Sequence, residues 1–202
     1  MKKMFTGNAK NRLTLGFLTG VVAVAEVCCG GSAMAATPFV LAYTDGQDPQ
    51  SLTNFKSFHS NLSAVALGSA YGILANGTLD LTGLTATTTS IISSAKSYGL
   101  PIYATVSDFS NATGAFDPNI SLTIDKTAAS RSAAITNIVN LAVNNGFAGI
   151  NLDMEGVGQE TNGPTAADTS NFTAVVTALA SALHAKGLKL IESVPAIDGT
   201  SA

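Results

Sequence analysis

The segment Gly146–Glu155 places polar side chains at alternating positions, where they could carry out acid–base chemistry. Side chains of a strand alternate between its two faces, so Asn151, Asp153 and Glu155 share one face together with Gly149. The two carboxyl-bearing residues lie about 6.6 Å apart along such a strand. Neighbouring carboxylates do not both ionise cheaply, so one keeps its proton to higher pH. A protonated carboxylic acid beside an ionised one is what cleavage of a glycosidic bond requires.

Two other interpretations of the Asp153–Glu155 pair stay open on spacing alone. An Asp-x-Glu sequence is also typical of a solvated strand end, and two carboxylates can serve as ligands of Ca²⁺ or Mg²⁺. Asn151 in line with the pair, and a glycine that leaves room beneath it, favour a functional site.

The rest of the chain alternates short apolar runs with longer helical patterns. We predict five strands, at Phe39–Tyr43, Leu62–Leu67, Pro101–Val106, Phe147–Asp153 and Leu188–Val194. Four helices are predicted between them, at Pro49–His59, Ala86–Tyr98, Thr127–Asn145 and Asp168–Lys186. The last two helices are followed by Gly146 and Gly187, as expected of left-handed C-caps. Strands alternating with helices of this length predict βαβ units and a parallel sheet.

Two inserts interrupt the alternation. Ile73–Leu81 contains Asn76-Gly77 between apolar residues, which predicts a hairpin. Ser107–Lys126 is a polar stretch that follows the third strand. Loops at the carboxyl ends of parallel strands build the sites of α/β proteins, so we expect this stretch to border a cleft.

Composition and charge exclude several classes of protein. Neither a Gly-x-Gly-x-x-Gly motif after the first strand nor a phosphate-binding Gly-Lys-Ser/Thr loop occurs, which argues against dinucleotide or nucleotide binding. Residues 36–202 contain six basic and twelve acidic residues, without a cluster of cations that could face phosphates. No His/Asp spacing suggests zinc. We expect no metal, no cofactor and no nucleic-acid partner.

The N-terminus resembles a secretory signal. A basic start precedes an apolar stretch at 13–27 and the small residues Ala33-Met34-Ala35, so we predict a signal peptide at 1–35 and a mature domain at 36–202. A membrane anchor is the alternative, but about 20 clean apolar residues would be needed. We expect a protein secreted to the exterior or cell envelope, with no stable membrane anchor after cleavage. Cys28 and Cys29 both fall within the signal, so the mature domain has no disulfide.

The strand segment resembles the family 18 glycoside hydrolases, which include chitinases and spore-cortex-lytic glucosaminidases. Their fourth barrel strand carries Asp-Gly-x-Asp-x-Asp-x-Glu, and this chain has Ala-Gly-Ile-Asn-Leu-Asp-Met-Glu at 148–155. The resemblance extends over 39–195, and Pro101–Phe109, Phe116-Asp117 and Arg131 fit it as well. It implies an α/β fold of the (β/α)8 TIM-barrel type. A complete barrel typically takes about 250 residues, so we expect an incomplete one, with about five β/α units present and the working protein continuing further.

The resemblance also implies roles for individual residues. Glu155 would be the general acid, Asp153 would orient the N-acetyl group of the substrate, and Asn151 would hydrogen-bond Asp153 where many members have Asp. Substrate-binding residues would be Tyr43, Phe109, Phe116, Gly149 and Met154, the last in place of the usual aromatic residue. Ala148 replaces the first Asp of the motif, and the chain has no Trp to form the usual sugar floor.

The function expected from this resemblance is secreted hydrolysis of β-1,4-linked N-acetylglucosamine polymers, chitin or peptidoglycan. Catalysis would be substrate-assisted, with retention of configuration. The alternative is a non-catalytic glycan-binding protein on a degenerate barrel, which Asn151, Ala148 and the lack of Trp favour. A third hypothesis is an unrelated α/β protein in which the motif is accidental. The expected partner is the polysaccharide.

Overall fold

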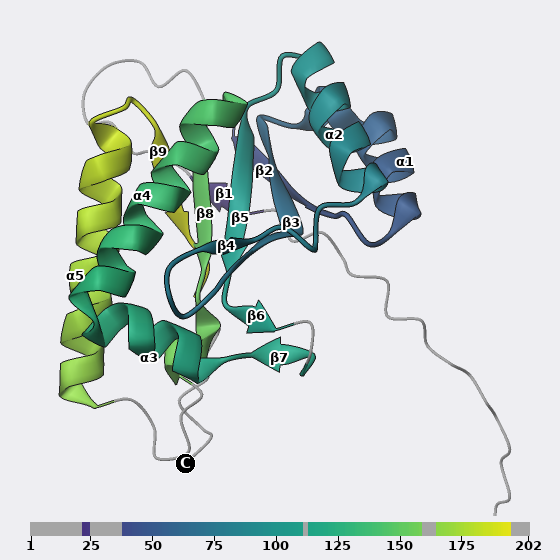
Figure 1. The fold of residues 1–202 in the computed structure, drawn as a ribbon. Coiled ribbons are helices and arrows are strands. Elements are labelled where there is room, and N and C mark those ends of the chain that lie inside the picture. Colours follow the sequence, from purple (N-terminus) through teal and green to yellow (C-terminus); the bar gives the residue numbers. More distant parts are fainter. Residues whose placement is uncertain (1–21, 25–37, 111–112, 159–164, 195–202) are drawn as a thin grey trace, which may run out of the picture.

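The fold is a curled parallel sheet covered by helices (Figure 1). The structure is a computed structural model, and it describes residues 22–24, 38–110, 113–158 and 165–194. Its parallel strands are β2 (Phe39–Asp45), β3 (Ala64–Ile73), β5 (Ile102–Ser107), β8 (Gly149–Asp153) and β9 (Lys189–Glu192). The crossover helices are α1 (Pro49–Phe58), α2 (Ala86–Ser97), α4 (Ala128–Asn145) and α5 (Ala166–His184).

Strand order identifies the type of fold. The order is β2-β3-β5-β8-β9, so each new parallel strand is added beside the preceding one. A doubly wound sheet would reverse its order at a switch point, whereas a barrel adds strands in one direction. These five β/α units therefore form an incomplete TIM-type barrel, as the sequence predicts.

The helices begin and end where local sequence dictates. Asp48 caps α1 by accepting the Gln50 N–H, with Pro49 at the first helical position. A capping box joins Thr165 and Asp168 at the start of α5. The C-cap of α4 is Gly146, with φ of 65°, as the sequence predicts.

The two inserts differ in how well the sequence describes them. The first is the predicted hairpin: β4 (Leu79–Asp80) pairs antiparallel with the end of β3. The polar stretch, expected as a loop, contains more structure. It forms the short hairpin of β6 (Phe109–Ser110) and β7 (Ala115–Phe116), then helix α3 (Pro118–Lys126). Asp117 caps α3 and Pro118 opens it, a helix-start signal that the polar composition concealed.

Most of the buried apolar side chains lie between the sheet and the helices. This outer core contains alternate residues of β3, β5 and β8, among them Val65, Leu67, Ile150 and Leu152, together with the inward faces of α2, α4 and α5. The opposite face of the sheet has a much smaller apolar cluster, of Leu41, Ala64, Ala66 and Tyr103. The helices therefore stabilise one face and leave the other available for polar groups.

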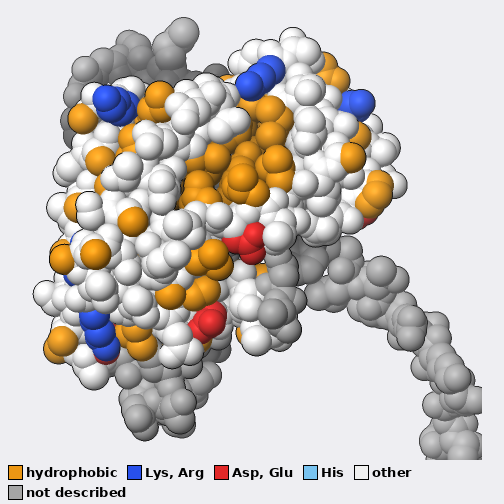
Figure 2. All heavy atoms as spheres, viewed as in Figure 1, with side chains coloured by type: hydrophobic (Ala, Val, Ile, Leu, Met, Phe, Trp, Pro, Cys, Tyr) orange, Lys and Arg blue, Asp and Glu red, His pale blue; other side chains and the backbone are white. Residues whose placement is uncertain are grey.

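The surface is sparsely charged. In the view of Figure 2, Lys and Arg side chains are scattered near the margin and acidic side chains are isolated. This pattern agrees with the 11% of charged residues in the chain. No continuous basic surface that could attract phosphates appears on this face.

The predicted signal peptide lies largely outside the described residues. Only Val22–Val24 is described there, as strand β1, which pairs antiparallel with β2. No helix among the described residues is long and apolar enough to cross a membrane. The cleavage site stays a prediction.

The outer core yields a test of the fold. Leu152→Ala removes a side chain that is 0% exposed, so it should lower the free energy of unfolding by about 2–5 kcal/mol. Leu81→Ala, at a leucine that is 54% exposed, should cost less than about 1 kcal/mol. Denaturant unfolding of both variants measures the difference. Equal losses would contradict the placement of Leu152 under the helices.

Candidate active site

Asn151 is the centre of a hydrogen-bond network on the inner face of the sheet. Its side chain is 0% exposed, and its Oδ1 accepts hydrogen bonds from the Tyr43 hydroxyl and the Ser193 hydroxyl, both at 3.2 Å. Its Nδ2 donates to Thr105 Oγ1 at 3.3 Å. Asn151 therefore links side chains from β2, β5 and the end of β9, and its predicted partner Asp153 is not among these contacts.

Asp153 and Glu155 follow Asn151 at the carboxyl end of β8. Glu155 begins a short 3₁₀ turn, Glu155–Gly158, and both carboxyl-bearing side chains are half-buried. Burial is the largest cause of a pKa of Asp153 that is raised to about 7, and the charges of Glu155 and Asp108 and a hydrogen bond with Glu155 contribute to the same shift. The two carboxyl groups are thus close enough to interact, and Asp153 keeps its proton to higher pH than an ordinary aspartic acid.

Asp108 is a site residue that the sequence analysis did not single out. It directly follows β5, is 0% exposed, and accepts hydrogen bonds through Oδ2 from the Ser121 hydroxyl and from the Gly156 N–H. Burial raises its pKa to about 6, although these hydrogen bonds oppose the shift. The available signal was its position, since an Asp at the carboxyl end of a parallel strand lies at the edge where sites form.

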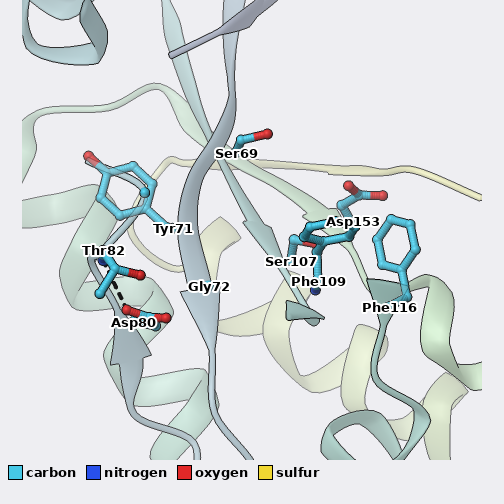
Figure 3. Close-up of a pocket in the computed structure, with 10 residues that line it drawn as sticks. Ser69, Tyr71, Gly72, Asp80, Thr82, Ser107, Phe109, Phe116 and Asp153 are labelled. Carbon is cyan, nitrogen blue, oxygen red and sulfur yellow. Dashed lines mark hydrogen bonds between the residues drawn. The ribbon is translucent and has the colours of Figure 1, made fainter. Parts of the chain in front are cut away.

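A pocket opens above these strand ends. Its volume is about 360 Å³, and it is lined by residues of three parallel strands and the inserts: Ser69, Tyr71, Gly72, Asp80, Thr82, Gly83, Ser107, Phe109, Phe116 and Asp153. In Figure 3, Asp153, Phe109 and Phe116 lie together on one side and Tyr71 and Asp80 on the other. The polar insert does border a cleft, as the sequence predicts.

The two phenylalanines form an aromatic pair at this pocket. Phe109 on β6 and Phe116 on β7 lie edge to face, with ring centroids 5.4 Å apart. Phe109 is 41% exposed although it is a large apolar side chain. An exposed aromatic ring beside a carboxyl group can stack on the apolar face of a sugar.

Gly149 and Met154 occupy positions that fit structural roles. A Cβ at Gly149 would overlap the backbone of Lys189, so the absence of a side chain lets β8 and β9 pair closely. Met154 is 4% exposed and packs in the outer core. The structure gives neither residue an exposed side chain for a ligand, and their assignment as substrate-binding residues stays a prediction.

A further carboxyl group lies near the pair. Glu192 on β9 is half-buried, and burial together with the charge of Asp153 raises its pKa to about 8. Periodicity alone does not say which face Glu192 occupies. It is in register with the outward-facing Leu152, so it lies on the helix side of the sheet.

The described residues contain no group of three His, Cys, Asp or Glu side chains that could hold a metal ion. Within that part of the chain, the pocket is lined by Asp153 and the aromatic pair. Glu155 and the Asn151 network adjoin Asp153 on β8 and the turn after it, but they are not among the lining residues. Such a set can transfer a proton to a bound ligand and position its rings.

Comparisons by sequence do not assign the chain. No family model matches it, and no curated protein matches it.

Solved structures give clear similarities. A class V chitinase from Pseudomonas fluorescens Pf-5 is 47% identical with a TM-score of 0.73, and the match covers 78% of this chain and 45% of that one. A chitinase from Chromobacterium violaceum is 33% identical with a TM-score of 0.68, covering 79% of this chain and 46% of that one. The spore cortex-lytic enzyme of Bacillus cereus shares the fold at 20% identity and a TM-score of 0.61, covering 75% and 34%.

The present chain thus spans under half the length of these structures. Its five parallel strands in barrel order, and its identity to two chitinases over more than three quarters of its residues, agree with the motif at 148–155. The chain is therefore similar to chitinase-type glycoside hydrolases, and it holds five β/α units of an incomplete TIM-type barrel.

Proposed function

We propose that this chain is the part of a secreted glycoside hydrolase that contains its acid–base pair. The substrate would be a β-1,4-linked N-acetylglucosamine polymer, chitin or peptidoglycan. The observation that carries the proposal is the coupled pair of Asp153 and Glu155 at the carboxyl end of β8, with Asp153 lining a pocket. Similarity to two chitinases supports the choice of substrate class.

Glu155 is the proposed general acid, which protonates the glycosidic oxygen of the leaving sugar. The N-acetyl carbonyl oxygen of the substrate attacks the anomeric carbon, so no side chain of the protein serves as nucleophile. Water then attacks the anomeric carbon of the cyclic intermediate from the face that the leaving sugar has vacated, with Glu155 as general base. The C–O bond to the acetamide oxygen breaks, the N-acetyl group is restored, and configuration is retained.

Asp153 has the role of orienting the N-acetyl group. Its raised pKa supports this role, because a carboxyl group that exchanges a proton with Glu155 can both donate to and accept from the acetamide. Asn151 cannot exchange a proton, so its part is to hold Tyr43 and Thr105 in place beneath the pair. Tyr43 is half-buried and its hydroxyl donates to Asn151, so its ring is the part that we propose to contact substrate.

Phe109 and Phe116 are the proposed sugar platform. Their place at the pocket beside Asp153 supports the assignment. The chain has no Trp, and a pair of Phe rings offers apolar contact without the hydrogen bond that an indole would donate.

A non-catalytic glycan-binding protein is the second candidate. The amide at Asn151, where a third carboxyl group would complete the proton chain of the motif, favours it. In that case the protein would bind to chitin beads or to peptidoglycan and release no reducing ends. Binding together with reducing-end release would exclude this candidate.

Glu155→Gln tests the general acid. The amide has a similar shape but donates no acid proton, so the rate on N-acetylglucosamine oligomers should fall by about 100-fold or more while binding is retained. The measurement is release of reducing ends, compared with oligomer binding by calorimetry, in the longest available form of the protein.

Glu192→Gln is the matched control. Glu192 is a neighbouring carboxyl group with a pKa raised to about 8, so at pH 6 the amide replaces a group that is already protonated. Its rate should stay close to that of the unchanged protein. Equal rates for Glu155→Gln and the unchanged protein would exclude Glu155 as the acid.

Phe109→Ala tests the aromatic platform. Loss of the exposed ring should weaken binding of N-acetylglucosamine oligomers by about 1–2 kcal/mol, a 5- to 30-fold increase in Kd. Phe58→Ala on α1 removes a ring that is 59% exposed and does not line the pocket, and it should leave Kd unchanged. Equal effects of the two substitutions on Kd would place the sugar elsewhere.

The raised pKa values predict how stability depends on pH. The folded-state pKa values of Asp153, Asp108, Asp125 and Glu192 are about 7, 6, 6 and 8, all above those of unfolded carboxyl groups. The folded state therefore binds protons more tightly than the unfolded state, and stability falls as pH rises from about 4 to 8. The free energy of unfolding should be lower at pH 8 than at pH 5.

Asp153→Asn should make this decline smaller, because it removes one of the four groups. Denaturant unfolding at the two pH values measures the effect. A free energy that rises from pH 5 to pH 8, or an unchanged decline in the variant, would contradict the pKa assigned to Asp153.

A further inference from the structure

We propose that Asp108 is a positioning residue for Glu155. Its carboxylate holds the N–H of Gly156 and so fixes the turn from which the Glu155 side chain projects. This inference rests on the proposed function, because the effect on the rate requires Glu155 to act as the general acid.

The contacts of Asp108 connect three segments that are distant in the sequence. Its Oδ2 accepts the Gly156 N–H at 3.1 Å, across 48 residues, and also accepts the Ser121 hydroxyl of α3. Its backbone carbonyl accepts the Asp117 N–H at 3.0 Å, where the insert returns from β7. Asp108 thus holds β5, α3 and the turn after β8 in one arrangement.

The turn fits closely against this support. A Cβ at Gly156 would lie 2.9 Å from the carbonyl carbon and oxygen of Asp117 and would overlap Asp108 Oδ2. The peptide after Glu155 therefore packs directly against the Asp108 carboxyl group and the Asp117 backbone, which leaves no space for a side chain at position 156. A displacement of about 1 Å in a catalytic group can cost about 100-fold in rate, so such a support matters.

The carboxyl group at position 108 is more costly to bury than an apolar side chain would be, so packing alone does not explain it. Asp108 is 0% exposed and its Oδ1 has no hydrogen-bond partner within the described residues. A fully buried carboxyl group with one unpaired oxygen destabilises the fold. Its negative charge also contributes to the raised pKa of Asp153, and Asp125 of α3 is the other acidic group near it. The structure therefore keeps a costly group at the point where it bonds the turn that carries Glu155.

Hydrogen exchange at the Gly156 amide tests the contact without any substrate. In the unchanged chain this amide should exchange slowly, because its acceptor is buried. Asp108→Ala should speed its exchange by about 10-fold or more, and Asp108→Asn, which keeps an oxygen acceptor, should restore most of the protection. Two-dimensional NMR of the ¹⁵N-labelled chain gives the rates.

Asp125→Ala is the matched control. Asp125 is also 0% exposed, and burial likewise raises its pKa, but its carboxyl oxygens bond nothing in the described residues. Asp125→Ala should therefore leave the exchange protection of the Gly156 amide as it is in the unchanged chain. The inference is wrong if the Gly156 amide is as protected from exchange in Asp108→Ala as in the unchanged chain. It is also wrong if Asp125→Ala reduces this protection as much as Asp108→Ala does.

Kinetics in the longest available form then distinguishes positioning from simple support of the fold. Asp108→Ala should lower kcat by roughly 10- to 100-fold with KM nearly unchanged, because misplacement of the acid affects only the transition state. Asp108→Asn should recover most of kcat, and Asp125→Ala should retain it. A rise in KM with kcat unchanged would overturn the positioning role.

The two measurements separate the two proposals. An unchanged protein that releases no reducing ends contradicts the proposed function, while loss of Gly156 protection in Asp108→Ala still supports the hold of Asp108 on the turn. Normal activity in Asp108→Ala at full folding contradicts the inference and leaves the proposed function intact.

Discussion

The hydrogen bond between the Tyr43 hydroxyl and Asn151 Oδ1 defines the shape on which the site depends. These residues lie on β2 and β8, with β3 and β5 between them. In a flat sheet, three strand spacings would separate the two backbones by about 14 Å, farther than the side chains reach. The oxygens are 3.2 Å apart because the sheet curls toward its inner face. The curl brings the first strand over the motif strand, and the amide of Asn151 satisfies the polar groups that meet there. A carboxylate at position 151 would accept these bonds but could not donate to Thr105, so the amide suits this network.

The same curvature explains the electrostatics of the site. Four acidic residues have raised pKa values: Asp108, Asp125, Asp153 and Glu192. Asp108 follows β5, Asp153 and Glu192 end β8 and β9, and Asp125 lies on α3. Desolvation is the largest cause for each of them, because the strand ends converge and the insert covers them. Asp168 is the contrast: its ion pair with Lys126, at 2.8 Å, is the largest cause of a pKa lowered to about 2. Asp168 is buried in the capping box of α5, where Lys126 of α3 pairs its charge. Asp153 is thus the raised group that lines the pocket, whereas Asp168, a helix cap, is ionised and held in an ion pair.

Local sequence patterns predicted the repeating strands and helices of the fold. Features that depend on contacts between residues distant in the sequence were not predicted. Period-2 and helical patterns gave the five parallel strands and four crossover helices, with ends displaced by a few residues at most except at β3, which runs to Ile73 through a register shift. The polar insert hid α3, because its Asp-Pro start has few apolar residues after it. Alternation placed Asn151 and Asp153 on the inner face correctly. Asp108 escaped notice because its partner Gly156 is 48 residues away, and no spacing rule connects them. The close approach of β9 to Gly149 likewise depends on how neighbouring strands pack, which the sequence alone does not reveal.

The two faces of the sheet have different roles. The outer face buries its large aliphatic side chains against the helices, and each such residue contributes about 1.5–3 kcal/mol to stability. The inner face carries small apolar residues, the Asn151 network and the catalytic candidates. Unpaired buried carboxyl groups cost stability, and the outer core offsets that cost because it does not depend on them. Substitutions at inner polar positions should thus change the chemistry more than the fold, and substitutions at outer positions the reverse. Asp108 lies at the junction, since it touches both α3 and the turn after β8. A residue in that position connects the helical layer to the turn that carries the proposed acid. Its contacts therefore support the fold and, under the proposed function, the reaction as well.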